Sequence, residues 1–239
     1  MIIMKTQEKN FDGIKLSGFT AILIMLALTG TAIYLLSLPQ TPSIIAGVIC
    51  GICVVVMLPG FMIIQPNNSR VLTFFGRYAG TVISNGFYWV NPLFLKSTVT
   101  LRILNLNIDP IKVNDKVGNP IMIGAVVVWR IKDTYKASFD ISGNIREFVQ
   151  IQSDAALRQV AGMYAYDTNE TIDKVTLRSD ESGEITQRLE DELNSRLAIA
   201  GIEIVEARIN YLAYASEIAS VMLRRQQADA IISARERIV

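Results

Sequence analysis

Near its start the chain reads LSGFTAILIMLALTGTAIYLLSL (Leu16–Leu38) and, five residues later, IIAGVICGICVVVMLPGFMII (Ile44–Ile64). The whole segment from Leu16 to Ser69 contains no charged residue. A helix that spans a bilayer needs about 20 consecutive apolar residues, and both runs reach that length. Because lipid offers the backbone no hydrogen-bond partners, the runs are expected to be helical. The linker Pro39–Ser43 is too short to cross a bilayer, so the sequence predicts an antiparallel transmembrane hairpin.

The second apolar run contains two patterns that bear on how the helices pack and end. Gly47 and Gly51 form G-x-x-x-G, which permits close helix approach, although glycine is also common filler in membrane helices. Pro59-Gly60 is expected to kink or end the helix. Phe61–Ile64 would then either continue the helix or lie in the interfacial zone. The residues assigned to the hairpin are Leu16, Leu38, Pro39, Pro42, Ile44, Gly47, Gly51, Pro59, Gly60 and Ile64.

Basic residues flank the hairpin on both sides, whereas its loop carries no charge. They are Lys5, Lys9 and Lys15 before it and Arg70 and Arg77 after it. Basic residues favour the cytoplasmic side of a membrane. The first run is also too long for the apolar core of a signal peptide. We therefore expect a retained anchor in the plasma (inner) membrane, with both ends of the hairpin cytoplasmic.

The composition excludes several classes of protein. The 239 residues are 51% hydrophobic, which is typical of a membrane-attached chain, and the net charge of +1 gives no sign of a nucleic-acid surface. Histidine, the commonest general base and metal ligand, is absent. Cys50 and Cys53 form C-x-x-C inside the second apolar run. We interpret them as small residues on a buried helix face rather than as a redox pair.

No catalytic motif is recognisable in the chain. The patterns G-x-S-x-G, Walker A, G-x-G-x-x-G and H-E-x-x-H are all missing. Glu190 and Asp191 are neighbouring carboxylates, but successive helical positions point in different directions, and we interpret both as solvated helix surface. Trp89 is interpreted either as a core residue or as an interfacial aromatic. We expect no catalytic residue, no cofactor and no metal.

Beyond residue 64 the pattern changes to strands followed by helices. Thr98–Val113 is expected to be a longer strand region with a bulge or bend near Ile103, and the apolar segment Pro120–Ile131 to be a central strand. Helices are predicted from Asn144 to about Met163 and before Gly201, then a strand at Ile202–Tyr211 and a last helix from Ser216. This order predicts an α+β fold with an antiparallel sheet. The expected domains are residues 1–15, 16–64, 65–113, 114–212 and 213–239.

The last helix has an apolar seam at 3-4 spacing, interrupted by two arginines. Arginine suits an interface between subunits better than a closed core, where its charge must be paired. No glycine or proline ends the helix, so we expect it to be the start of a longer coiled-coil-like helix that is truncated here. Packing on its own domain is the alternative. The expected interface comprises Ile218, Val221, Arg225, Ala228, Ile232, Arg235 and Val239.

Four segments in the right order resemble the SPFH or Band 7 domain of stomatins, prohibitins and flotillins. They are Asn67–Pro92, Val113–Asp133, Ala156–Val160 and Gly201–Val239. Two features depart from the family pattern. Ala215-Ser216-Glu217 stands where many members have a proline before the last helix, and a hairpin replaces the single anchor of many members.

The resemblance implies a membrane scaffold rather than an enzyme. Members of the family form large homo- or hetero-oligomeric rings or cages that enclose a membrane patch and often regulate integral partners, such as membrane-bound AAA proteases. The expected partners are therefore the lipid bilayer, further copies of this chain and such integral proteins. Two alternatives remain open: a small accessory subunit of a transporter or protease, and a membrane hydrolase that uses a serine and a lysine.

Overall fold

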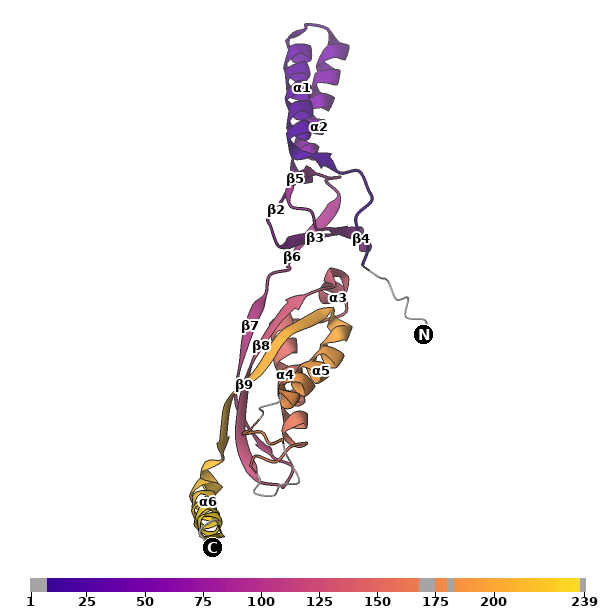
Figure 1. Cartoon of the computed structure of the whole chain (residues 1–239). Helices are drawn as coiled ribbons and strands as arrows, with labels where there is room; N and C mark the ends of the chain where they lie inside the picture. Colours follow the sequence, from indigo (N-terminus) through magenta and orange to yellow (C-terminus); the bar gives the residue numbers. More distant parts are fainter. Residues whose placement is uncertain (1–7, 168–174, 180–182, 237–239) are drawn as a thin grey trace, which may run out of the picture. The chain divides into compact units, whose positions relative to one another are not determined.

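A computed structural model describes residues 8–167, 175–179 and 183–236 (Figure 1). Its contacts divide the chain into two units. The first unit runs to Arg102 and takes in Asp133–Ser138, and the second comprises Ile103–Lys132 and the chain from Phe139 onward. The sequence placed the subdomain boundary after residue 113. The structure groups residues 103–113 with the second unit because they pair with a strand of that unit.

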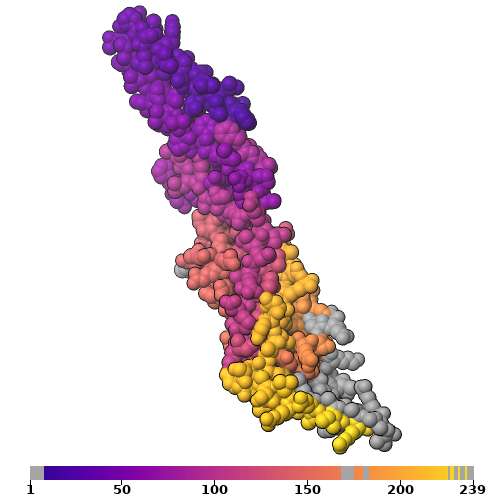
Figure 2. Space-filling view, turned by 90° about the vertical axis from the view of Figure 1, so that its left-hand side faces the viewer, coloured from indigo at the N-terminus to yellow at the C-terminus, as the bar shows by residue number. Residues whose placement is uncertain are grey.

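Two antiparallel helices confirm the predicted hairpin: α1 spans Gly18–Ser37 and α2 spans Thr41–Met57. Both are long and apolar enough to cross a membrane. Their few buried residues are small (Gly18, Ala21, Ala32 and Gly47), whereas most of the large apolar side chains are exposed. In the space-filling view the visible face of the hairpin is not covered by the sheets of its unit (Figure 2). A surface of this kind is stable in lipid rather than in water.

The two glycines of the G-x-x-x-G pattern have different surroundings. A Cβ atom on Gly47 would lie 2.8 Å from Leu36 Cγ and 3.1 Å from the carbonyl oxygen of Ala32, both in α1. A Cβ atom on Gly51 would meet nothing within 4 Å. Only Gly47 is therefore needed for the close approach of the two helices.

Both apolar runs are longer than the helices they form. Pro59-Gly60 ends α2 as predicted: a 3-10 turn, η1, covers Leu58–Gly60. Phe61–Ile64, expected as helix or as an interfacial segment, instead forms strand β2, in which Ile64 is 3% exposed. At the other end Leu16–Ser17 forms strand β1. Strand β1 thus leads directly into α1, and α2 is joined to β2 by the short turn η1.

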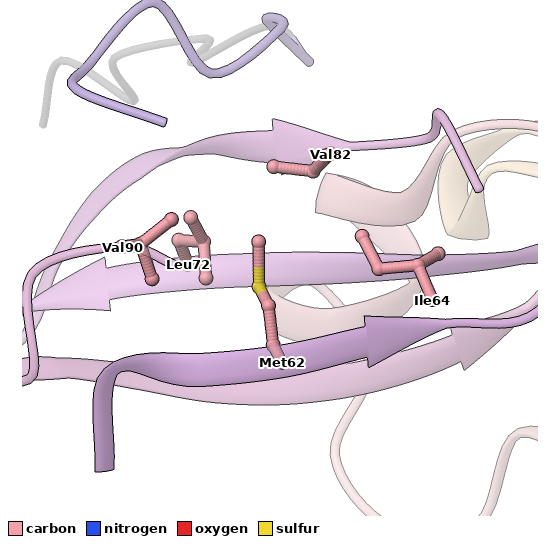
Figure 3. Packing of buried hydrophobic residues seen from close by; sticks show 5 residues of the cluster. All are labelled: Met62, Ile64, Leu72, Val82 and Val90. Carbon is pink, nitrogen blue, oxygen red and sulfur yellow. The ribbon is translucent and has the colours of Figure 1, made fainter. Parts of the chain in front are cut away.

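The first unit contains two small antiparallel sheets. One has the order β1-β5-β2 and the other β4-β3-β6. The strands not yet bounded are β3 (Asn68–Phe74), β4 (Arg77–Val82), β5 (Gly86–Trp89) and β6 (Phe94–Thr100). Their core is a cluster of five buried side chains, which point toward one another in Figure 3: Met62, Ile64, Leu72, Val82 and Val90. The short helix α3 (Thr134–Phe139) contributes residues up to Ser138 to this unit.

The second unit is built on one antiparallel sheet of order β7-β8-β9. Strand β8 occupies Pro120–Ile131 and is central, as its apolar sequence predicted. Helices α4 and α5 pack on the sheet, and α6 follows β9. The remaining bounds are β7 (Leu104–Asn114), α4 (Ile145–Ala161), α5 (Glu184–Leu197), η2 (Ala198–Ala200), β9 (Ile202–Tyr214) and α6 (Ser216–Glu236). The α+β class and the hairpin followed by antiparallel sheets and a C-terminal helix are confirmed.

The strand region expected at Thr98–Val113 is interrupted near Ile103, where a bulge or bend was predicted, and the interruption divides it into β6 and β7. The two strands belong to different units, and the exposed Ile103 begins the second. The register irregularity lies farther on, between Ile108 and Ile111. Pro110 lies within that interval and has no N–H to donate to a ladder, which accounts for the irregularity there.

The interpretation of Glu190 as solvated surface is also wrong. Its carboxylate accepts a hydrogen bond from the backbone N–H of Ala207 at 3.1 Å. Asn194, one turn later in α5, accepts from the N–H of Ile204 at 3.0 Å. Two N–H groups of β9 are thus satisfied by side chains of the helix beside it. Asp191 is exposed, as expected.

Replacing Gly47 tests the packing of the hairpin. Gly47→Val should force the helices apart and lower stability by about 1–3 kcal/mol, the usual cost of overpacking. Gly51→Val is the matched control and should be neutral, since open space surrounds that position. Thermal unfolding of the full chain in mild detergent measures both. Equal unfolding temperatures for the two variants would show that Gly47 is not the contact point.

Candidate functional site

The hairpin is attached to the first unit at both of its ends through a single strand. Strand β5 lies between β1 and β2 and pairs with both. Leu16 before α1 and Phe61 after α2 both lie opposite Trp89. The two ends of the hairpin are therefore held by the backbone hydrogen bonds of one four-residue strand. We call this arrangement the hairpin junction.

Side chains at the hairpin junction satisfy carbonyl groups where α2 ends. The indole Nε1 of Trp89 donates to the carbonyl oxygen of Met57 at 2.9 Å, and the N–H of Val90 donates to that of Gly60 at 3.0 Å. Lys96 Nζ donates to the carbonyl oxygens of Pro59 and Phe61. The last carbonyls of a helix have no partner within it, so the Trp89 bond caps α2 at Met57, and the other bonds hold the η1 turn that continues the helix end and the first residue of β2.

Lys96 was not singled out from the sequence, where it is one lysine in an apolar strand. Burial, and to a lesser degree the charge of Arg70, lower its pKa below the ordinary value. Its position at a helix C-terminus favours the protonated form, because the helix dipole is negative there. Lys96 is therefore suited to holding the carbonyl end of α2 beside an apolar surface.

Aromatic rings fill the base of the hairpin. Phe87 of β5 stacks on Phe61 with ring centroids 5.6 Å apart and meets Phe19 of α1 edge-on at 5.5 Å. Trp89 is half-buried and uses its polar atom to cap α2, so the structure assigns it a role between the two interpretations offered by the sequence. The segment Phe87–Trp89 was the signal that could have located the junction.

The tail before the hairpin folds back onto the same unit. The N–H of Thr81 in β4 donates to the carbonyl oxygen of Lys9 at 2.9 Å, and the N–H of Phe11 donates to that of Thr81 at 3.0 Å. The Phe11 ring packs against the core cluster. The carboxylate of Glu8 accepts from the hydroxyl of Thr134 at 2.6 Å. The described part of the tail is therefore packed against the first unit through both backbone and side-chain contacts.

The expected interface helix, α6, is fixed to its unit at its first turn. The N–H of Ala215 donates to the carbonyl oxygen of Pro120 at 3.0 Å, and Glu217 forms an ion pair with Lys112. Lys112 lowers the pKa of Glu217 by hydrogen bonding to its charged form. A proline at residue 215 could not make the first of these bonds, because it has no N–H to donate.

Most of the predicted interface positions of α6 are uncovered within the chain. Val221, Arg225, Ala228 and Arg235 are exposed, and Ile218 is half-buried. The side chain of Ile232 and the whole of Val239 lie outside what the structure describes. Leu223 and Ile231, which the sequence seam omitted, are also exposed. The apolar surface of α6 is thus broader than the predicted seam.

The described residues show little that supports catalysis. No group of three or more His, Cys, Asp or Glu residues among them could hold a metal ion. Cys50 and Cys53 are free thiols in α2. Ser84 Oγ accepts a hydrogen bond from Lys15 Nζ at 3.3 Å, and the Lys15 side chain is exposed to solvent. This pair is poorly suited to the hydrolase alternative.

Comparison with known proteins places the chain from Met62 onward in one family. The model of the SPFH domain / Band 7 family matches residues 62–238, which is more than half of the chain. A search of curated proteins found no match. The match begins at Met62 in β2, so it includes β5 and most of β2 but not β1 or the two helices of the hairpin.

Removing the indole donor tests the cap on α2. Trp89→Phe should leave the Met57 carbonyl without its partner, at a cost of about 1–3 kcal/mol, and should speed hydrogen exchange of amides from residues 57 to 61. Trp129→Phe is the control: its Nε1 is buried and has no hydrogen-bond partner within the described chain, so only ring volume is lost. Equal rates of amide hydrogen exchange at residues 57–61 in the two variants would show that the indole hydrogen bond does not hold the helix end.

Proposed function

Because this chain belongs to the SPFH domain / Band 7 family, we propose that it is a scaffold anchored in a membrane by the α1–α2 hairpin, and not an enzyme. The observation that supports this proposal most directly is the hairpin junction. An apolar hairpin that its own unit leaves uncovered is fixed at both ends to one strand of the domain. Such an attachment suits a protein that transmits position and force between a membrane and an assembly.

We propose that the sheets and the tail lie on the cytoplasmic side of the plasma (inner) membrane. The contacts of Lys9 and Phe11 with Thr81 support a common side for the tail and the first unit. The basic residues Lys9, Lys15 and Arg77 flank the hairpin, and basic residues favour the cytoplasmic side.

We propose further that α6 mediates assembly into a large homo-oligomeric ring or cage. In the described part of α6 the apolar side chains of Val221, Leu223 and Ile231 are exposed, and Val221 is 62% exposed. An amphipathic helix that is not covered by its own domain gains stability when a second copy covers it. The family suggests that such an assembly encloses or regulates integral membrane proteins, of which AAA proteases are one class.

A cysteine at each of three positions tests the topology. With Cys50 and Cys53 replaced by Ser, single cysteines at Asp12, Thr41 and Val117 would be treated with a membrane-impermeant maleimide on intact cells. Only Thr41→Cys should react, because Thr41 begins α2 next to the turn that joins the two helices. Reaction of Asp12→Cys and Val117→Cys without Thr41→Cys would reverse the side, and reaction of only one of the two would contradict the hairpin itself.

Charge placed on the exposed face of α6 tests assembly. Val221→Asp with Ala228→Asp should convert a large particle into a much smaller species, as measured by the native mass of the full chain in mild detergent. The matched control is Ser220→Asp with Gln227→Asp, which adds the same charge on the same helix at exposed positions outside the predicted seam. Unchanged mass in the first variant would place the interface elsewhere. A small wild-type particle would favour the accessory-subunit alternative.

A further inference from the structure

A hollow of about 340 Å³ opens on the surface of the first unit, beside the tail. Residues from the end of β3, the start of β4, the start of β6 and the tail line it. Those that bear on its chemistry are Lys9, Arg77, Asn91, Tyr78, Phe74 and Phe94. We call it the tail pocket. It has no part in the assembly surface of α6 or in the cap on α2.

The polar lining of the tail pocket favours an anion. The side chains of Lys9 and Arg77 are exposed, and neither has an ion-pair partner among the described residues. Glu8, the acidic neighbour of Lys9 in the chain, is engaged by Thr134 at 2.6 Å. Asn91 uses its carbonyl oxygen to accept from the N–H of Leu93 at 3.0 Å, which leaves its amide N–H groups as further donors.

The two cations are held in place by the backbone. Lys9 is fixed through its carbonyl oxygen, which accepts from Thr81 at 2.9 Å. Arg77 follows the β3–β4 turn, in which Phe75 has φ 45° and Gly76 has φ 80°. A bulky residue with positive φ is uncommon and marks a turn held under strain. The tail pocket therefore presents its two charges from ordered segments.

The other lining of the tail pocket is aromatic. The rings of Phe74 and Phe94 lie 5.3 Å apart. Phe75, at the tip of the turn, packs edge-on against Phe74 at 4.8 Å and is 79% exposed. Cations beside exposed aromatic surface suit a ligand that is anionic at one end and apolar at the other. A bare phosphate ion would use only the charged part of this lining.

The tail pocket lies close to the hairpin junction. Asn91 is adjacent in sequence to Val90, whose N–H bonds to Gly60 at the end of the hairpin. Phe94 is two residues from Lys96, which caps α2, and two residues of strand span about 7 Å. A ligand in the tail pocket would therefore lie near the level at which a spanning hairpin meets lipid headgroups.

We propose that the tail pocket binds the phosphate of an anionic phospholipid headgroup, with Lys9 and Arg77 as its cationic contacts and Phe74 and Phe94 against the glycerol and upper acyl region. This inference rests on the proposed membrane anchorage. A soluble phosphate compound would present the same charged group, but it would leave the aromatic lining and the exposed Phe75 without a function. Membrane-facing basic residues typically act in this way toward anionic lipids.

The test is a titration of the full chain in mild detergent, followed by native mass spectrometry, with three ligands. They are dihexanoyl phosphatidylglycerol, dihexanoyl phosphatidylcholine and inorganic phosphate. Phosphatidylglycerol should bind at one molecule per subunit and more tightly than either of the others. Lys9→Gln with Arg77→Gln should weaken it on the order of 30-fold, because each cation near an anionic headgroup contributes about 1 kcal/mol.

Two controls separate this proposal from its premises. Lys15→Gln with Arg102→Gln removes the same charge from the first unit outside the tail pocket and should leave the affinity within about twofold, a small change on the affinity scale. Resistance of the membrane-bound protein to alkaline carbonate extraction measures anchorage independently of ligand binding. If the wild-type protein were extracted, the proposed membrane anchorage would be overturned, and the binding site would not. An equal fall in the affinity for phosphatidylglycerol in the two double variants would overturn the site. If inorganic phosphate bound as tightly as phosphatidylglycerol, and if that binding also required Lys9 and Arg77, the ligand would not be a lipid.

Discussion

The structure depends on the pairing of β5 with both ends of the hairpin. A helical hairpin in a bilayer can tilt and slide if flexible segments join it to its domain. Here Leu16 and Phe61 are each paired with Trp89, and only the three-residue turn η1 lies between α2 and its strand. Moving the hairpin relative to the sheets would break the ladders on both sides of β5 and expose their hydrogen-bonding groups. The hairpin and its adjoining sheet should accordingly move as one body.

The composition of the junction follows from where it lies. The carbonyls at the end of α2 have little water available if the helix ends near lipid, and an unsatisfied carbonyl there is costly. Trp89 and Lys96 both supply a donor at the end of an apolar body. Such side chains place a hydrogen-bond donor at the helix end while the rest of the side chain is apolar. Gly60 completes the arrangement, because a Cβ atom there would lie 2.3 Å from the indole nitrogen.

The sequence could predict the features that depend on local pattern. The length of the apolar runs located α1 and α2, Pro59-Gly60 located the end of α2, and the apolar run at Pro120–Ile131 located the central strand. It could not predict contacts between distant segments. Ile64 looked like membrane helix because its neighbours are apolar, yet its strand pairs with Gly86. Glu190 looked solvated because its partner is the backbone of Ala207, which no side-chain pattern reveals. The tail pocket, too, joins four segments and has no sequence motif.

Lys9 belongs both to the tail and to the tail pocket. Docking of the tail on the first unit is therefore linked to binding of a ligand in the tail pocket. The side chain can reach the pocket only while the carbonyl of Lys9 accepts from Thr81 and the Phe11 ring packs on the core. An anionic headgroup that binds Lys9 therefore binds only the form in which the tail is docked. A ligand of one form stabilises that form by mass action, and the docked tail in turn raises the affinity for the ligand by the same factor. Lipid composition would in this way set how firmly the tail is held beside the hairpin junction.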